Sequence, residues 1–114
     1  MTLDQLRQQH CEPRKGKEHA LASTDVERYL SILPNWKRAA DGTEIIKTFK
    51  FKNFYRTMAF VNAVAWIANS EDHHPDMEVG YGGCTVRYST HDVGGISLND
   101  FICAAKVETL LNRH

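Results

Sequence analysis

The sequence contains no long hydrophobic run. Its longest mainly apolar stretch, from Met58 to Ala68, is interrupted by Asn62, whereas a helix needs about 20 apolar residues to span a bilayer. The opening residues MTLDQLRQQH also lack the apolar centre of a signal peptide. We therefore expect no membrane partner and a cytoplasmic location.

An excess of charge of either sign is also missing. Lysine and arginine total 14, aspartate and glutamate total 14, and the formal net charge is zero. General nucleic-acid binding usually depends on a basic excess, so no nucleic-acid partner is expected. One local basic cluster, Arg14, Lys15 and Lys17, is interpreted as part of a solvated arm.

Cysteine is scarce, and glycine-rich phosphate loops are absent. The three cysteines, Cys11, Cys84 and Cys103, show no CxxC spacing, which favours reduced thiols over a disulfide framework. Cys84 and Cys103 fall on apolar faces, so a structural role is expected for both. The glycines between Gly80 and Gly83 are interpreted as a hairpin turn.

The composition fits one globular domain. The chain has 114 residues, of which 42% are hydrophobic and 25% are charged. Residues 1–22 are mostly polar and weakly periodic, and Pro13 and Gly16 interrupt them. We expect residues 1–22 to form a poorly ordered N-terminal arm and residues 23–114 to form the domain.

The first half of this domain alternates between helical and strand-like patterns. Residues 23–25 form an N-cap pattern for a helix that Pro34 ends. A short strand over 36–40, a turn at Asp41-Gly42 and a strand over 44–51 follow. On the second strand, one face carries mainly apolar residues together with a lysine: Ile45, Lys47, Phe49 and Phe51.

A long helix is expected from a cap at Asn53 to about Asn69. Apolar residues at helical spacing define its expected core stripe, and three more widen it: Phe54, Met58, Val61, Ala65 and Ala68, then Phe60, Val64 and Ile67. Such a broad apolar face suits packing on a sheet or against a partner.

Two more strands, over 77–81 and 84–90, surround Gly82-Gly83, and Ser97 with Asp100 forms a capping box for a last helix. The order α-β-β-α-β-β-α predicts an α+β fold. We expect a four-stranded antiparallel sheet with three helices packed on one face.

Three of the six histidines lie in two short clusters near strand ends. One cluster is Glu71 to Asp76, with His73 and His74, and the other is Ser89 to Asp92, with His91. Imidazole can both give and take a proton near neutral pH, so such a group suits general acid/base catalysis.

Two other interpretations of the histidines remain open. A His-His pair before proline also occurs as an exposed loop feature. A metal site is the second alternative, with three histidines and Asp72 or Asp76 as ligands. Adjacent histidines diverge in direction, however, and metal-binding pairs usually have wider spacings.

The histidines belong to a longer spaced pattern: His73-His74-Pro75, five residues, Tyr81, nine residues, His91, eight residues, Asp100. This pattern resembles the motif of the pterin-4a-carbinolamine dehydratase family, in particular its bacterial members. The upstream segments around Leu33 to Trp36, Phe49 to Lys52 and the 54–68 helix are also similar. The resemblance covers about residues 24–112.

The resemblance implies a fold and a reaction. The family has four antiparallel strands and three helices, and its members are homodimers or homotetramers. They remove water from 4a-hydroxytetrahydrobiopterin, the carbinolamine that an aromatic amino acid hydroxylase leaves, and give quinonoid dihydropterin. The family needs no metal or organic cofactor, and a functional link to such a hydroxylase follows.

The resemblance also assigns roles to individual residues. The three active-site histidines of the family correspond to His73, His74 and His91. The residues expected to bind the pterin are Asp72, Ser89, Thr90 and Asp100, of which Asp100 equally suits the first turn of a helix. Trp36 matches a family tryptophan and either borders the pocket or packs in the core.

One position departs from the family pattern, and two rival functions remain. Many members have a glutamate four residues before the first motif histidine, where this chain has Asn69. Asparagine cannot carry a charge, so slower turnover or a lower pH optimum is expected. Animal members of the family also bind a transcription factor through their association helices, so a protein-binding role through the 54–68 helix is one alternative to the dehydratase function. Metal-dependent hydrolysis is the other.

Overall fold

A four-stranded antiparallel sheet forms one layer of the protein in the computed structural model, which describes residues 1–112. The strand order is β1-β2-β4-β3. The strands are β1 (Lys37–Arg38), β2 (Ile45–Lys50), β3 (Asp76–Gly80) and β4 (Gly83–Tyr88). This arrangement confirms the expected α+β class with an antiparallel four-stranded sheet.

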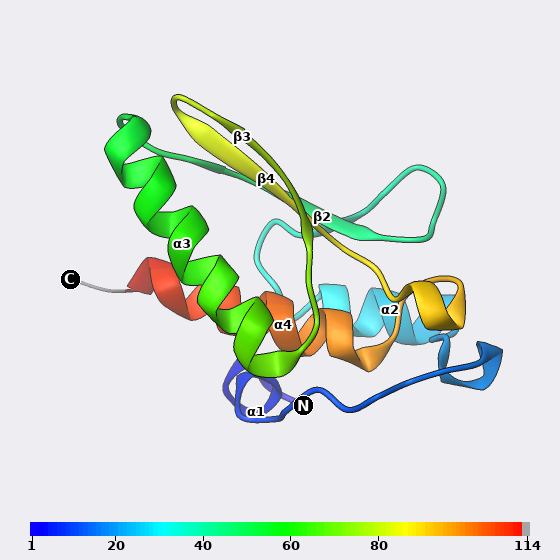
Figure 1. The fold of residues 1–114 in the computed structure, drawn as a ribbon. Coiled ribbons are helices and arrows are strands. Elements are labelled where there is room, and N and C mark those ends of the chain that lie inside the picture. Colours follow the sequence, from blue (N-terminus) through cyan, green and yellow to red (C-terminus); the bar gives the residue numbers. More distant parts are fainter. Residues whose placement is uncertain (113–114) are drawn as a thin grey trace.

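Helices form the second layer on one face of the sheet (Figure 1). This layer contains α2 (Ser23–Leu30), α3 (Phe54–Glu71) and α4 (Leu98–Glu108), and α1 (Leu3–Arg7) packs on the side of α4 away from the sheet. Short 3₁₀ turns are η1 (Lys17–His19), η2 (His91–Val93) and η3 (Thr109–Asn112). Within residues 1–112, no helix is long and apolar enough to cross a membrane.

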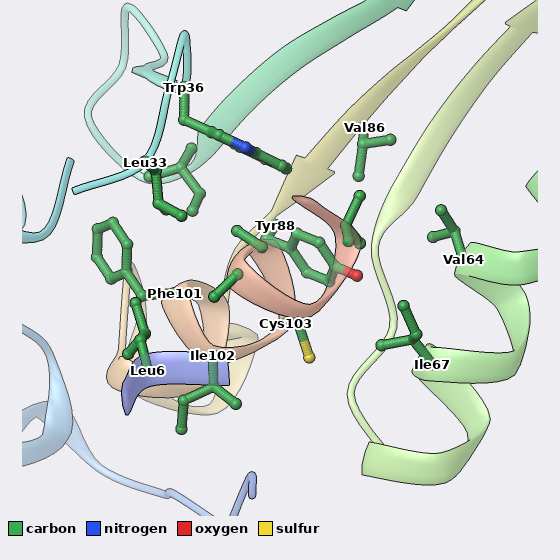
Figure 2. Close-up of a cluster of buried hydrophobic side chains, with 14 of the residues drawn as sticks. Leu6, Leu33, Trp36, Val64, Ile67, Val86, Tyr88, Phe101, Ile102 and Cys103 are labelled. Atoms are coloured by element: carbon green, nitrogen blue, oxygen red, sulfur yellow. The ribbon is translucent and has the colours of Figure 1, made fainter. Parts of the chain in front are cut away.

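The core lies between the sheet and α4 (Figure 2). From β4, Cys84, Val86 and Tyr88 point inward and are at most 1% exposed. They share one buried cluster with Phe101 and Ile102 of α4, which are fully buried. Ser97 caps α4 and Asp100 completes the capping box, as the sequence pattern predicted.

A buried ion pair accounts for the lysine on the inward face of β2. Lys47 Nζ lies 2.7 Å from Glu108 Oε2 at the end of α4 and also donates to the carbonyl of Pro34. The indole Nε1 of Trp36 donates to the same Glu108 oxygen at 2.8 Å. Trp36 therefore packs in the core, 5.9 Å from the Phe49 ring, and does not border the candidate site described below.

The core face of α3 differs from the expected stripe. Its buried residues are Thr57, Phe60, Val64, Ile67 and Ala68, whereas Phe54 is 48% exposed. Phe60 packs on the rings of Phe49 and Phe51, at 4.6 and 5.0 Å. Because α3 carries apolar residues around most of its circumference, periodicity could not show which side meets the sheet.

The N-cap of α2 also differs from the expected one. The helix begins at Ser23 itself, its N-cap is Ala22, and no side chain caps it. Ser23 Oγ instead accepts a hydrogen bond from Arg38 Nη1 at 3.0 Å. The hydroxyl thus joins α2 to β1, a tertiary contact that the local sequence pattern could not predict.

The segment expected to be a poorly ordered arm, residues 1–22, lies against α4 in the structure. Leu6 of α1 is fully buried in the core, and the Sγ atoms of Cys11 and Cys103 lie 3.5 Å apart. Leu3 and Leu21 pack at the edge of the same core. These apolar residues are too widely and irregularly spaced to give a periodic signal.

Candidate active site

A buried carboxylate from α4 holds a histidine that follows α3. His73 Nε2 lies 2.6 Å from Asp100 Oδ1, and Asp100 is fully buried. The other oxygen, Oδ2, accepts hydrogen bonds from Thr90 Oγ1 at 2.8 Å and from the Ser97 amide at 2.9 Å. Because a carboxylate only accepts hydrogen bonds, His73 carries its proton on Nε2. Its other ring nitrogen, Nδ1, is then the one that can exchange a proton with a ligand.

An aromatic ring fixes the plane of the same histidine. The ring of Tyr88, at the end of β4, stacks on His73 with centroids 6.0 Å apart and an interplanar angle of 8°. Tyr88 is fully buried, and burial raises the pKa of its phenol well above 10, so the ring stays neutral. The sequence placed Tyr88 on a buried face but gave no sign that it would support His73.

The end of α3 turns the two adjacent histidines away from the helix. Asp72 is its C-cap and has left-handed backbone geometry with φ 51°, and its amide and that of His73 both donate to the Ala68 carbonyl. His74 Nε2 then reaches back to Asn69 Oδ1 at 3.2 Å. Left-handed geometry is uncommon outside glycine and asparagine or aspartate, so this turn depends on Asp72.

The second histidine cluster lies in the loop after β4. Thr90 exchanges backbone hydrogen bonds with Gly95, at 2.7 and 3.4 Å, and this bridge closes a tight loop around η2. Gly94 has φ 73°, a geometry that glycine adopts without strain. His91 is the first residue of η2, and its side chain is exposed.

The two clusters meet in one surface pocket of about 330 Å³. All three candidate histidines and all the candidate binding residues except Asp100 line this pocket, and Asp100 lies buried behind His73. The lining residues are Asp72, His73, His74, Ser89, Thr90, His91 and Asp92. The structure therefore brings together residues 18 positions apart in the sequence, at a polar site suited to proton transfer.

The arrangement does not assemble the alternative metal site. Within residues 1–112, no three histidine, cysteine, aspartate or glutamate side chains are placed to hold one metal ion. His73 Nε2 is occupied by Asp100 and His74 Nε2 by Asn69. Their ring nitrogens therefore point to different partners, as expected for adjacent histidines.

The sheet, the helices on one face and the histidine-lined pocket define a small α+β protein with a candidate acid/base site. The family model described as "Pterin 4 alpha carbinolamine dehydratase" matches residues 19–110. The chain belongs to this family, which confirms the family resemblance of the sequence.

Similar proteins agree with this assignment. A protein of Xanthomonas campestris pv. campestris named "Putative pterin-4-alpha-carbinolamine dehydratase" is 56% identical over 108 residues, which are 95% of this chain and 92% of that protein. A protein of the same name from Stenotrophomonas maltophilia is 54% identical over 105 residues, 92% of this chain and 90% of that protein.

Solved structures share the fold. The crystal structure of a "transcriptional coactivator/pterin dehydratase" from Brucella melitensis has a TM-score of 0.77 at 27% identity, over 80% of this chain and 97% of that one. A pterin dehydratase-like protein described as a RuBisCO assembly factor has a TM-score of 0.59 at 21% identity, over 70% and 93% of the two chains. The second likeness shows the fold alone.

Proposed function

We propose that this protein is a hydro-lyase that dehydrates pterin-4a-carbinolamine by histidine general acid/base catalysis. The substrate is 4a-hydroxytetrahydrobiopterin and the products are water and quinonoid dihydropterin, in the recycling of tetrahydrobiopterin. The observation that carries the proposal is the convergence of His73, His74 and His91 on one pocket, with His73 held by a buried carboxylate.

The reaction needs one proton donor and one proton acceptor. The C4a–O bond breaks and the oxygen leaves as water, with a proton from an imidazolium. N5 loses its proton to a neutral imidazole or to water, and a C4a–N5 double bond forms. We assign these two transfers to His73 and His91, which reach the pocket from different segments of the chain, and give His74 a positioning role.

The remaining pocket residues bind and orient the ring. Asp72, Ser89 and Thr90 present carboxylate, hydroxyl and backbone groups to the pocket, as a ring rich in donors and acceptors requires. Asp100 does not line the pocket, so its role is to hold His73 from behind. The proposed mechanism uses neither a metal ion nor an organic cofactor.

The exposed side of α3 supports an oligomeric state for the enzyme. Trp66 is 72% exposed and Tyr55 is 82% exposed, and Phe54 lies on the same helix at 48%. Large exposed aromatic residues are typical of protein interfaces. We propose a homodimer or homotetramer that uses α3, with a functional link to an aromatic amino acid hydroxylase.

The same surface favours a second candidate function, a regulatory role through protein binding. The exposed aromatic residues of α3 are the observation behind it, and the Brucella melitensis relative carries "transcriptional coactivator" in its description. The two candidates differ in one respect: protein binding through α3 does not require the histidines.

The decisive experiment follows the loss of carbinolamine absorbance in a coupled phenylalanine hydroxylase assay with EDTA present. Wild type should accelerate the loss, and His91→Ala should lower the enzymatic rate by about 10²- to 10⁴-fold. His19→Ala removes an exposed histidine outside the pocket and is the matched control. A folded wild type without effect would refute the dehydratase proposal, and wild-type turnover by His91→Ala would refute the assigned mechanism.

A further inference from the structure

A second polar pocket, of about 390 Å³, adjoins the candidate active site on the side of the N-terminal segment. The two pockets share Asp72, His73, Thr90 and Asp92. The second one is closed by residues 11–15, and the family match begins only at residue 19. This N-terminal wall therefore lies outside the residues that the family model matches.

Hydrogen bonds to two residues beside the site hold this wall in place. The Cys11 amide donates to Glu71 Oε1 at 2.7 Å, at the end of α3. Asn99 is only 4% exposed. Its side-chain Nδ2 donates to the Glu12 carbonyl at 2.7 Å, and its Oδ1 accepts hydrogen bonds from the Glu12 amide and from Arg14 Nε. Asn99 and Glu71 directly flank Asp100 and Asp72 in the sequence.

The far end of the segment is fixed to the loop that carries His91. The Gly16 amide donates to the Asp92 carbonyl at 2.9 Å. Gly16 has φ 90°, and a Cβ at this position would lie 2.3 Å from Glu18 Oε1, so glycine suits the turn. Residues 11–16 thus bridge the two clusters that supply His73 and His91.

The chemistry of the second pocket favours a neutral, hydroxylated group. Arg14 and Lys15 offer donors from the N-terminal wall, and Asp72 and Asp92 offer acceptors from the domain. A hydroxyl group donates one hydrogen bond and accepts two, so a chain of hydroxyls can use both kinds of partner. An apolar group would leave these donors and acceptors unpaired, and an anion would meet the acidic residues of the lining, Glu12, Glu71, Asp72 and Asp92.

We propose that residues 11–16 form a subsite for the hydroxylated side chain that a pterin substrate carries at C6. The inference rests on the proposed dehydratase function, and it makes Arg14 and Lys15 specificity-determining residues. The pocket has room for several hydroxylated carbons, since one water-sized group takes about 30 Å³. The ring lies among the three histidines, and its side chain extends past His73 toward the N-terminal wall.

The test compares two carbinolamines, one from tetrahydrobiopterin and one from 6-methyltetrahydropterin, which lacks the hydroxyls. For Arg14→Ala with Lys15→Ala, the ratio of kcat/KM for the hydroxylated over the methyl substrate should fall about tenfold, mainly through KM. Lys17→Ala is the matched control, because Lys17 is basic and exposed but lines neither pocket. An unchanged ratio would overturn the subsite.

A binding measurement separates this inference from the proposed reaction. Calorimetry with 7,8-dihydrobiopterin and 6-methyl-7,8-dihydropterin needs no turnover. If wild type binds dihydrobiopterin about tenfold more tightly and the Arg14/Lys15 variant loses this preference, the subsite stands even if no carbinolamine reacts. Equal binding of the two pterins by wild type would refute the subsite, whereas dehydration of both carbinolamines would leave the proposed function intact.

Discussion

His73 and Asp100 are 27 residues apart in the sequence, yet His73 Nε2 and Asp100 Oδ1 lie 2.6 Å apart. The contact joins the turn after α3 to the first turn of α4. Thr90 and Ser97 donate to the other oxygen of the same carboxylate. Asp100 therefore links the turn after α3 and the loop after β4 to the start of α4. A buried carboxylate with this set of donors fixes both the orientation and the protonated nitrogen of the histidine.

Replacement of Asp100 by asparagine should therefore lower kcat while the fold persists. The asparagine oxygen can still accept from Thr90 or Ser97, but its NH₂ group toward His73 would force the proton onto Nδ1. We expect a loss of about 10²-fold in kcat, little change in KM and an altered pH–rate profile. A profile that matches wild type would mean that Asp100 serves only as a helix cap.

Asn69 gives a second prediction, because its amide oxygen contacts His74 at 3.2 Å. Asn69→Glu restores the carboxylate that many family members have at this position. A negative charge beside His74 favours its imidazolium form, so turnover should rise severalfold and the pH optimum should shift upward. Asn69→Gln keeps the polarity without the charge and is the control; equal behaviour of the two variants would contradict the electrostatic explanation.

The buried pair of Lys47 and Glu108 predicts a large effect on stability. Lys47→Met leaves the Glu108 carboxylate buried with only the Trp36 indole as a partner. The free energy of unfolding should fall by about 2–4 kcal/mol in urea denaturation, because an uncompensated buried charge is costly. The double variant with Glu108→Gln should recover part of this loss, since it removes the charge. A loss in Lys47→Met below 0.5 kcal/mol, roughly the effect of a surface substitution, would contradict this view.

Glu71 makes stability depend on acid pH. Burial by itself would raise its pKa, but hydrogen bonds from the Cys11 amide and His10 outweigh burial and lower the pKa below its ordinary value of 4.5. A carboxylate whose pKa is lower in the folded state stabilises the fold above its unfolded pKa. That stabilisation is lost as the pH falls through the folded pKa.

The variant Glu71→Gln should therefore be less stable than wild type by about 1–3 kcal/mol at pH 7. The difference should shrink as the pH falls below 4.5, and chemical denaturation at pH 7 and pH 3.5 measures it. Glu27→Gln, at an exposed position in α2, is the matched control. If the difference in the free energy of unfolding between wild type and Glu71→Gln stays constant with pH, Glu71 acts through packing alone.

The exposed face of α3 predicts a change of oligomeric state. Trp66→Glu places a charge at a position that is 72% exposed in the single chain. If α3 forms the subunit interface, light scattering should show a dimer or tetramer for wild type and a shift to monomer for this variant. Tyr81 is exposed in the turn between β3 and β4 and provides the control, because Tyr81→Glu should leave the molar mass of the assembly unchanged. A lower molar mass in both variants would argue against α3 as the specific interface.

Most local features of the fold followed from short-range patterns. The caps at Asn53 and Ser97, the inward alternation of β4 and the hairpin between β3 and β4 were all readable, because each depends on residues within a few positions. The core face of α3 was not readable, because Phe60 rather than Phe54 packs on the rings of Phe49, in β2, and Phe51, just after β2.

The sequence by itself determined the family, the alternation of elements and which residues were candidates for the site, because motif spacing and local periodicity are properties of the chain. Tertiary structure alone decided how those candidates are connected. Asp100 contacts His73, Tyr88 stacks on His73, and residues 11–15 line the adjoining pocket. These are contacts between residues distant in the sequence, and they exist only once the sheet and α4 have packed together.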